Sequence, residues 1–264
     1  VMQNETLTVV FCTCDNYSDL WHDFFRLFKK YWPQFNGQII LNTETKAFKY
    51  EGLNISEPLN CPLNTSWSDR LSLSLKKAKA EYVLIMLDDF YLRASVDNKR
   101  FLETLEFMNS NSGIVSVTYL HEPGMKKEVS GLEGFNYRKN FSTYKMTAHL
   151  TLYRKEYLMS VLKAGESAWE FEVNGTVRAW FKRGRFLCPN NSFEIFPYDF
   201  GSLVIRGGYL KPVKEYFEKN EGVVFNPERP ILEKWEGNAS EGGLRKKIKY
   251  LIKGLFSVFK GSAL

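Results

Sequence analysis

The chain has 264 residues, enough for one large domain or two small ones, and 44% of them are hydrophobic while 25% are charged. The aromatic share of 16% excludes a disordered chain, and no apolar run approaches the length of about eighteen residues that would indicate a membrane-spanning helix. The net charge is +6, and six positive charges lie after the last acidic residue, Glu241: Arg245, Lys246, Lys247, Lys249, Lys253 and Lys260. Residues 1–243 are therefore neutral, which argues against a nucleic-acid partner.

The cysteines indicate a reducing compartment. Cys12, Cys14, Cys61 and Cys188 are too few and too irregularly spaced for a disulfide scaffold or a four-cysteine zinc site. We therefore expect reduced structural thiols in a cytosolic protein. The first residues lack a basic segment followed by an apolar one, so we also expect no signal peptide.

The first elements along the chain predict a β-α-β unit. Residues 7–12 are a short apolar, β-branched run of the kind that is buried in parallel sheets. Residues 15–18 have turn and cap chemistry, and residues 20–31 then carry apolar side chains at helical spacing until Pro33. Residues 38–41 form the second predicted strand.

The alternation of strands and helices continues through the next segment. Ser66 or Ser68 can cap a helix, and residues 82–87 form the strongest strand of the sequence. A helix over residues 101–108 and a strand over residues 113–117 follow. This alternation predicts an α/β fold with a mostly parallel central sheet flanked by helices.

The second half is less regular. Residues 119–142 are polar and contain glycine, which predicts a long loop. Residues 144–185 carry one strand-like piece and two helical ones, residues 186–215 look irregular, and residues 220–243 look like a linker.

Residues 244–264 predict an amphipathic helical tail. Its apolar residues recur at helical spacing, and cations occupy the other face: Leu244, Ile248, Leu251, Ile252, Leu255 and Phe259 form the apolar stripe. This pattern is typical of a helix that lies in an anionic membrane interface. The alternative is an amphipathic helix that packs on the body of the protein or on a partner subunit.

Acidic residues follow two of the predicted strands. In an open α/β sheet, ligands bind at the carboxyl ends of the strands, where this sequence has Thr13-Cys14-Asp15 and Asp88-Asp89. Two adjacent carboxylates repel each other unless a cation is present, and Mg²⁺ or Mn²⁺ would leave open positions for a diphosphate. The alternative for Asp88-Asp89 is a helix cap.

The segment Tyr82-Val83-Leu84-Ile85-Met86-Leu87-Asp88-Asp89-Phe90 resembles the metal-binding strand end of GT-A-fold glycosyltransferases. Thr13-Cys14-Asp15 and Trp67-Ser68-Asp69-Arg70 stand where that family contacts the nucleotide. Together with the later Trp169-Glu170-Phe171-Glu172, these motifs are similar to those of bacterial transferases of capsule and lipopolysaccharide synthesis. The resemblance covers about residues 7–212.

The resemblance implies a Rossmann-like GT-A fold that binds a nucleoside-diphosphate sugar with Mn²⁺ or Mg²⁺. Residues 1–118 would form the nucleotide-sugar-binding half and residues 119–219 the acceptor-binding half, followed by the linker 220–243 and the tail 244–264. The implied donor-binding residues are Thr13, Asp15, Arg70, Asp88 and Asp89.

The acidic pair departs from the family pattern. The usual Asp-x-Asp would fall on Leu87-Asp88-Asp89, so the first carboxylate is missing. Asp89 would then bind the metal, and Asp88, also a candidate metal ligand, would contact the ribose instead.

The acceptor side needs a general base for the attacking sugar hydroxyl. A carboxylate beside apolar groups suits this role, and the resemblance favours Glu170, with Glu172 as the alternate. Trp169 offers a flat face for a sugar ring, and His149 either contacts the donor sugar or acceptor or is a core residue. An ordinary helix start is the alternative for the two glutamates.

Two cations near a glycine turn complete the predicted site. Arg206 and Lys211 flank Gly207-Gly208 and could neutralise the leaving diphosphate. Surface cations without a functional role are the alternative.

The sequence thus predicts an inverting glycosyltransferase that acts on a glycan or lipid-linked acceptor in bacterial surface polysaccharide synthesis. We expect it in the cytoplasm, peripheral to the inner face of the cell membrane, with its tail on the anionic membrane surface. The alternatives are a nucleotidyltransferase of similar sheet layout and a catalytically silent, membrane-peripheral module that binds carbohydrate.

Overall fold

The computed structural model describes residues 6–120, 125–190, 194–198 and 202–233. The strands in these ranges are β1 (Leu7–Cys12), β2 (Gln38–Asn42), β3 (Asn54–Ile55), β4 (Tyr82–Leu87), β5 (Ile114–Thr118), β6 (Met125–Glu128), β7 (Phe135–Arg138), β8 (Thr151–Arg154), β9 (Arg185–Pro189), β10 (Val204–Ile205), β11 (Gly208–Leu210) and β12 (Ile231–Leu232). The helices are η1 (Asp15–Leu20), α2 (Trp21–Tyr31), α3 (Trp67–Lys77), α4 (Asn98–Ser110), α5 (Lys155–Val161), α6 (Ala168–Glu170), η2 (Phe171–Gly175), α7 (Thr176–Trp180) and α8 (Lys211–Glu221).

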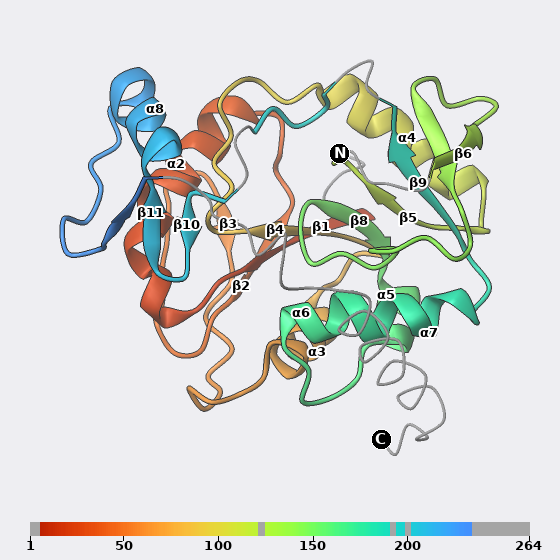
Figure 1. Cartoon of the computed structure of the whole chain (residues 1–264), viewed down its shortest axis with the longest axis horizontal. Helices are drawn as coiled ribbons and strands as arrows, with labels where there is room; N and C mark the ends of the chain where they lie inside the picture. Colours follow the sequence, from red (N-terminus) through yellow and green to blue (C-terminus); the bar gives the residue numbers. More distant parts are fainter. Residues whose placement is uncertain (1–5, 121–124, 191–193, 199–201, 234–264) are drawn as a thin grey trace.

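One large sheet joins both predicted halves of the chain (Figure 1). Its strand order is β3-β2-β1-β4-β8-β5-β9-β7-β6, and all of these strands run in one direction except β8 and β7. The expectation of a mostly parallel sheet is therefore confirmed. Because β8 lies between β4 and β5, both halves contribute strands to the same sheet.

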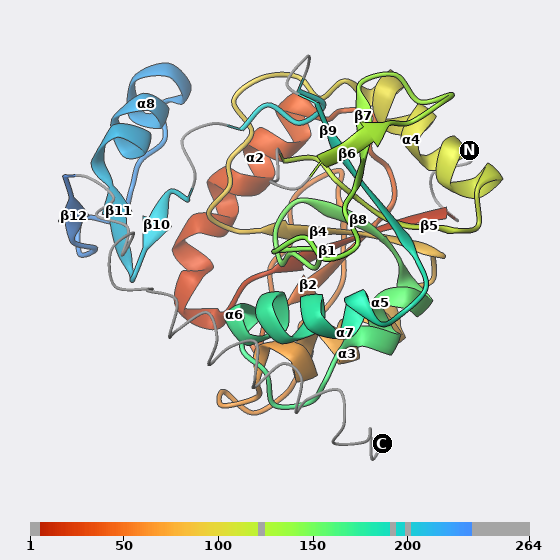
Figure 2. The same ribbon diagram turned by 45° about the vertical axis from the view of Figure 1, so that its right-hand side comes forward.

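Helices cover both faces of this sheet (Figure 2), with α2 and α4 on one side and α3, α5 and α7 on the other. The alternation of side chains along β1 explains the two layers. Val9 and Phe11 pack into the first core, whereas Val10 and Cys12 pack into the second. Burial on both faces is the reason that this strand is a continuous apolar run rather than an alternating one.

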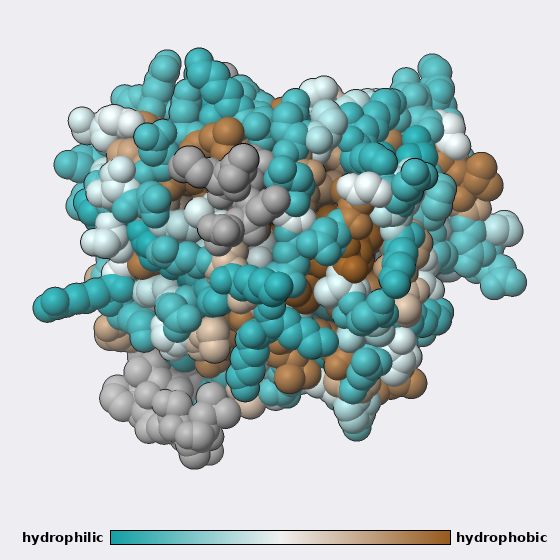
Figure 3. Space-filling model, turned by 180° about the vertical axis from the view of Figure 1, so that it is seen from behind, coloured by the Kyte–Doolittle hydropathy of each residue, from teal (hydrophilic) through white to brown (hydrophobic). Residues whose placement is uncertain are grey.

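Aromatic side chains fill much of the first core. Trp32 is fully buried, and its ring lies 5.4 Å from that of Phe28 and 5.1 Å from those of Phe101 and Phe196. The Trp32 indole N–H donates to the Asn98 side chain over 2.9 Å, which satisfies the polar atom that burial would otherwise leave without water. Seen from behind, the surface is mostly hydrophilic, with hydrophobic side chains in separate patches (Figure 3).

The loop predicted for residues 119–142 is wrong in part. Residues 125–128 and 135–138 form β6 and β7, which pair antiparallel and extend the sheet beyond β9. Phe135 of β7 is the one large, fully buried side chain in these two strands. The outermost strands of the sheet therefore lack the apolar run that identifies a strand in the sequence.

The irregular structure predicted for residues 186–215 is also wrong in part. This range contains most of β9, the hairpin of β10 and β11, and the start of α8. Arg206 and Gly207 form the two-residue turn of the hairpin with φ values of 50° and 84°, which are typical of the type I′ turn that joins short antiparallel strands.

The linker predicted for residues 220–243 is partly folded over its described part. Residues 231–232 form β12, which pairs parallel with β11. Arg229 binds Asp19 of η1 through two hydrogen bonds of 2.6 and 2.7 Å, and the Tyr209 hydroxyl donates to the same carboxylate over 3.1 Å. Contacts between residues far apart in sequence thus hold the three-stranded sheet of β10, β11 and β12 against η1.

The four cysteines are free thiols, three of them buried, as the sequence predicts. The predicted tail, residues 244–264, lies outside the described residues. No helix in the described ranges has the length and apolar character needed to cross a membrane.

Loss of the Arg229 contacts should loosen the C-terminal lobe formed by residues 204–232. We expect Arg229→Ala to lower the free energy of unfolding by about 2 kcal/mol, because it leaves Asp19 without its ion partner in a half-buried site. Lys211→Ala, which removes an exposed pair with Glu233, should cost much less, because exposed ion pairs contribute little to stability. Chemical denaturation of both variants checks the difference, and equal losses would contradict the anchoring role of Arg229.

Candidate functional site

The register of three parallel strands aligns their polar ends. Cys12, the last residue of β1, pairs with Asn42 of β2 and with Leu87 of β4. The next residues, Thr13, Thr43 and Asp88, therefore follow at one level along the carboxyl edge of the sheet.

Asp88 is buried at this edge and bonded to Thr13. The Thr13 hydroxyl donates to the Asp88 carboxylate, and the Trp21 indole N–H donates to the Thr13 oxygen over 2.7 Å. Burial and the neighbouring charge of Asp89 raise the pKa of Asp88 well above its ordinary value. A cation bound at this carboxylate would therefore stabilise its charged form.

Asp89 lies beside it and is partly exposed. Burial raises the pKa of Asp89 to about 7, and a hydrogen bond from Ser202 opposes the shift. The Asp89 carbonyl accepts from the Leu203 N–H over 2.8 Å, so the second acidic residue is held by the segment that leads into the β10–β11 hairpin.

These two carboxylates fit a divalent cation that is completed by a ligand. Within the described ranges, no cluster of three or more His, Cys, Asp or Glu residues forms a self-contained metal site. Mg²⁺ and Mn²⁺ bind through one or two carboxylates together with phosphate oxygens and waters. A cation would also favour the charged forms of Asp88 and Asp89, which their surroundings disfavour.

The predicted donor residue Asp15 supports the loop after β2. Its carboxylate accepts hydrogen bonds of 2.7 Å from Thr43, 2.6 Å from the Thr45 hydroxyl and 3.0 Å from the Lys46 N–H. Burial acts to raise its pKa, but the bonds from Thr45 and Thr43 outweigh burial and lower the pKa to about 2. With these contacts made, the carboxylate shapes the edge of the site rather than offering free acceptor positions.

Arg70 of α3 reaches the same edge. Its guanidinium pairs with Glu44, both side chains are buried, and Glu44 also accepts from the Asp15 N–H over 2.8 Å. Burial and Asp88 raise the pKa of the nearby Cys14 thiol, while Arg70 lowers it. Arg70 thus lies near Cys14 with its charge paired to Glu44.

The start of α3 also contacts the second half of the chain. Ser66 caps the helix by accepting from the Asp69 N–H over 3.1 Å, while the Ser68 hydroxyl accepts from the Glu166 N–H over 2.9 Å. The ring centroids of Trp67 and Phe171 lie 5.1 Å apart. The segment that carries the predicted base thus packs directly on the segment that carries Arg70.

Glu170 and Glu172 have different surroundings. Glu170 is exposed, and its carboxylate accepts from the Ser167 N–H over 3.0 Å in a capping box. Glu172 is half-buried in η2, a π-helical turn, and accepts from the Ala148 N–H over 2.8 Å. Such turns are frequent at functional sites, and Glu172 is the one that points to the neighbouring loop.

His149 belongs to this loop and not to a strand, because β8 begins at Thr151. Thr151 pairs antiparallel with Ile85 of β4, so the residues just before Thr151 lie toward the end of β4 that carries Asp88. Trp169 is 73% exposed, which leaves its ring available to a ligand.

Arg206 and Lys211 have other surroundings in the described contacts than the acidic pair. Arg206 is exposed at the tip of the β10–β11 hairpin. The Lys211 ammonium is 2.8 Å from the Glu233 carboxylate. Neither side chain makes a described contact with Asp88 or Asp89.

Sequence reasoning did not identify Glu44 or Arg229. Glu44 is the second residue after β2, and Asp88 is the first residue after β4. A search for polar residues just after each predicted strand could therefore have found Glu44. Arg229 could not be found in this way, because its charge lowers the pKa of Asp88 only after the lobe has folded back on η1.

No protein-family model matches the sequence, and no curated protein matches it. Solved structures share the fold. TarS 1–349 from S. aureus in complex with UDP-GlcNAc has a TM-score of 0.51 at 13% identity, over 95% of this chain and 71% of that one. The mannosyltransferase PcManGT from Pyrobaculum calidifontis, in complex with GDP-Man and Mn²⁺, has a TM-score of 0.50 at 11% identity, over 99% and 77%.

A further TarS 1–349 structure has a TM-score of 0.50 at 13% identity. The match covers 72% of this chain, and this chain spans 59% of the length of that fragment. The fold is therefore that of GT-A-type glycosyltransferases.

Asp15→Asn should destabilise the fold in a pH-dependent way. Because the folded pKa lies below the ordinary value of 3.8, the Asp15 contribution is present above pH 4 and is lost as the pH falls through about 2. We expect a loss of about 1–2 kcal/mol at pH 7. Urea unfolding between pH 3 and 7 checks this, and a gap between the two proteins that does not narrow toward pH 3 would contradict it.

Proposed function

We propose that the protein is a nucleotide-sugar-dependent glycosyltransferase. The observation that carries the proposal is the acidic pair Asp88-Asp89 at the carboxyl edge of a GT-A-type sheet. The same edge is where an open α/β sheet binds its ligands.

The donor in this proposal is a nucleoside-diphosphate sugar. Two proteins of the same fold are described in complex with UDP-GlcNAc and with GDP-Man and Mn²⁺. Asp89 and Asp88 would hold Mn²⁺ or Mg²⁺, which would balance the negative charge of the diphosphate when bound. Thr13 orients Asp88, Asp15 holds the loop after β2, and Arg70 adds positive charge.

The same proposal covers the acceptor and the inverting mechanism. The base takes the proton of the attacking hydroxyl on a glycan or lipid-linked acceptor. Glu172 suits this role better than Glu170, because Glu172 is half-buried beside the His149 loop whereas Glu170 caps its own helix. Trp169 would stack on a sugar ring, and His149 would contact the donor sugar or acceptor.

Surface polysaccharide synthesis at the inner face of the cell membrane remains part of the proposal. Its support is the sequence resemblance and the basic amphipathic pattern of residues 244–264. Arg206 is on an exposed turn and would reach a leaving diphosphate only by moving toward it, and Lys211 would first have to leave Glu233.

Asp89→Asn should abolish donor turnover. The substitution keeps the volume of the side chain but removes the charge that a divalent cation needs, so we expect a loss of at least about 10²-fold in donor hydrolysis with Mn²⁺. Hydrolysis of a panel of UDP- and GDP-sugars measures the effect.

The matched control for this prediction is Asp97→Asn, which also neutralises an aspartate but at the exposed cap of α4. It should retain donor hydrolysis. Near-normal turnover in Asp89→Asn would contradict the metal assignment.

Glu172→Gln should lower the rate by roughly 10²–10⁴-fold with little change in donor affinity, because it removes the base but not the donor contacts. Glu170→Gln should leave the rate and the fold nearly unchanged, because a glutamine oxygen can still accept from the Ser167 N–H in the capping box. Single-turnover rates and donor affinities of both variants provide the test. A large rate loss in Glu170→Gln alone would reverse the two roles.

A further inference from the structure

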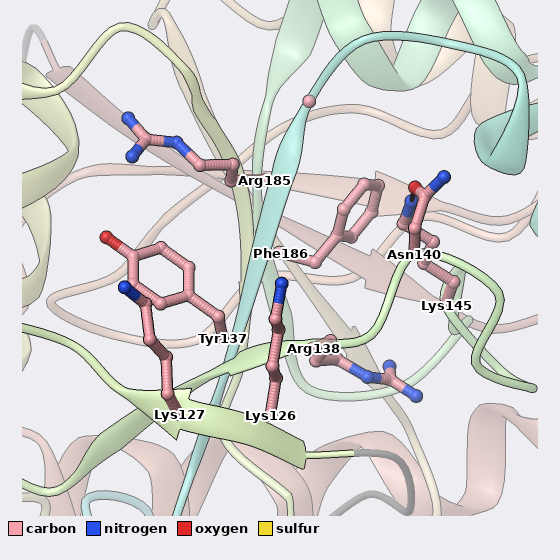
Figure 4. Close-up of a pocket in the computed structure, with 9 residues that line it drawn as sticks. Lys126, Lys127, Tyr137, Arg138, Asn140, Lys145, Arg185 and Phe186 are labelled. Carbon is pink, nitrogen blue, oxygen red and sulfur yellow. Dashed lines mark hydrogen bonds between the residues drawn. The ribbon is translucent and has the colours of Figure 1, made fainter.

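A second, basic pocket lies away from the acidic pair. It has a volume of about 300 Å³ and is lined by Lys126, Lys127, Tyr137, Arg138, Asn140, Lys145, Gly184, Arg185 and Phe186. Five of these residues are cations, and none is acidic. Figure 4 shows Arg185 on one side, Lys145 on the other, and Lys126 and Phe186 between them.

The strand register separates this pocket from the candidate active site. Arg185 begins β9 and pairs with Ile114, the first residue of β5. Thr118, at the other end of β5, pairs with Thr151 of β8, which in turn pairs with Ile85 of β4. Ile85 lies three residues before Asp88. At about 3.3 Å per residue, Arg185 and Asp88 are about 20 Å apart along the strands.

Lys145 makes the pocket a built site rather than a group of surface lysines. It is only 3% exposed. Its ammonium donates to Asn140 over 2.8 Å and to the Ala179 carbonyl over 3.2 Å, and it lies 4.6 Å from the centre of the Phe186 ring. Each of these partners is neutral.

Four of the cations in the pocket have no described carboxylate partner. Burial, and then the charge of Arg138, lower the pKa of Lys145 to about 8. In the part of the chain that the structure describes, no ion pair joins Lys126, Lys127, Lys145 or Arg185 to a carboxylate. A buried cation among like charges is costly unless an anion joins it.

The surroundings select the kind of anion. Several ammonium and guanidinium groups around one pocket match a group with several charged oxygens, such as a phosphoryl group. The half-buried ring of Tyr137 adds apolar surface for whatever carries that group. We propose that this basic pocket binds a phosphoryl group.

The loop that contributes Lys145 suggests where the group comes from. Lys145 is three residues before Ala148, the residue that Glu172 binds, so at most about 11 Å of chain separates them. Provided that the proposed transferase function holds, an acceptor could place a hydroxyl near Glu172 and a phosphoryl group in the basic pocket. The other source is free phosphate or pyrophosphate acting as an effector.

Binding of inorganic pyrophosphate to the full chain, measured by calorimetry in EDTA, tests the pocket without any need for turnover. We expect K126Q/K127Q to weaken binding about tenfold or more, because it removes two exposed contacts and leaves Lys145 in place. R185Q should weaken it as well. The matched control K76Q/K99Q removes two exposed lysines from α3 and α4 and should bind as the unaltered protein does.

Equal binding by K126Q/K127Q, R185Q and the unaltered protein would overturn the proposal, since the ion would then be held elsewhere, for example by the basic tail. Donor hydrolysis is measured separately. A chain that binds pyrophosphate in the pocket but hydrolyses no nucleotide sugar would keep this site and lose the proposed function.

To find the source of the phosphoryl group, we compare the rate of sugar transfer to a monosaccharide 6-phosphate with the rate of transfer to the same monosaccharide without phosphate. A preference for the phosphorylated sugar that K126Q/K127Q loses assigns the group to the acceptor. A change in donor hydrolysis caused by pyrophosphate, absent from K126Q/K127Q, assigns it to an effector. If neither effect is observed, the acceptor assignment is overturned.

Discussion

The hydrogen bond from Thr13 to the buried Asp88 carboxylate links the fold to the candidate site. It joins the ends of β1 and β4, and the Trp21 indole fixes the Thr13 oxygen from the first helix. A hydrogen bond to a charged group contributes about 1.5–3 kcal/mol, which offsets only part of the cost of burying two adjacent carboxylates. The remaining negative charge is what the proposed divalent cation would balance at this edge.

The surroundings of this edge are assembled from both halves of the chain. Asp15 and Glu44 bind the loop after β2 to the end of β1, and Glu44 pairs with Arg70 on α3. The start of α3 in turn holds Glu166, and the turn that follows carries Glu172. The segment with the proposed donor-binding residue Arg70 and the segment with the proposed base therefore contact each other through packed side chains.

The charges of the molecule are segregated. Negative charge gathers at the carboxyl ends of β1 and β4, whereas the basic pocket lies at the start of β9, toward the opposite edge. A substrate that is anionic at a distance from its reactive hydroxyl would be oriented by this separation. The loop from Lys145 to Ala148 connects the two regions.

The sequence by itself determined the α/β class, the mostly parallel sheet and the acidic strand end, because the apolar runs of residues 7–12 and 82–87 and the polar residues after them are local signals. It did not reveal β6 and β7, since edge strands with few buried side chains carry no such run. Tertiary structure alone decided the different surroundings of Glu170 and Glu172, the anchoring of Arg229 on Asp19, and the gathering of five cations in one pocket. Each of these depends on contacts between residues distant in sequence, whose energies arise only when the sheet brings them together.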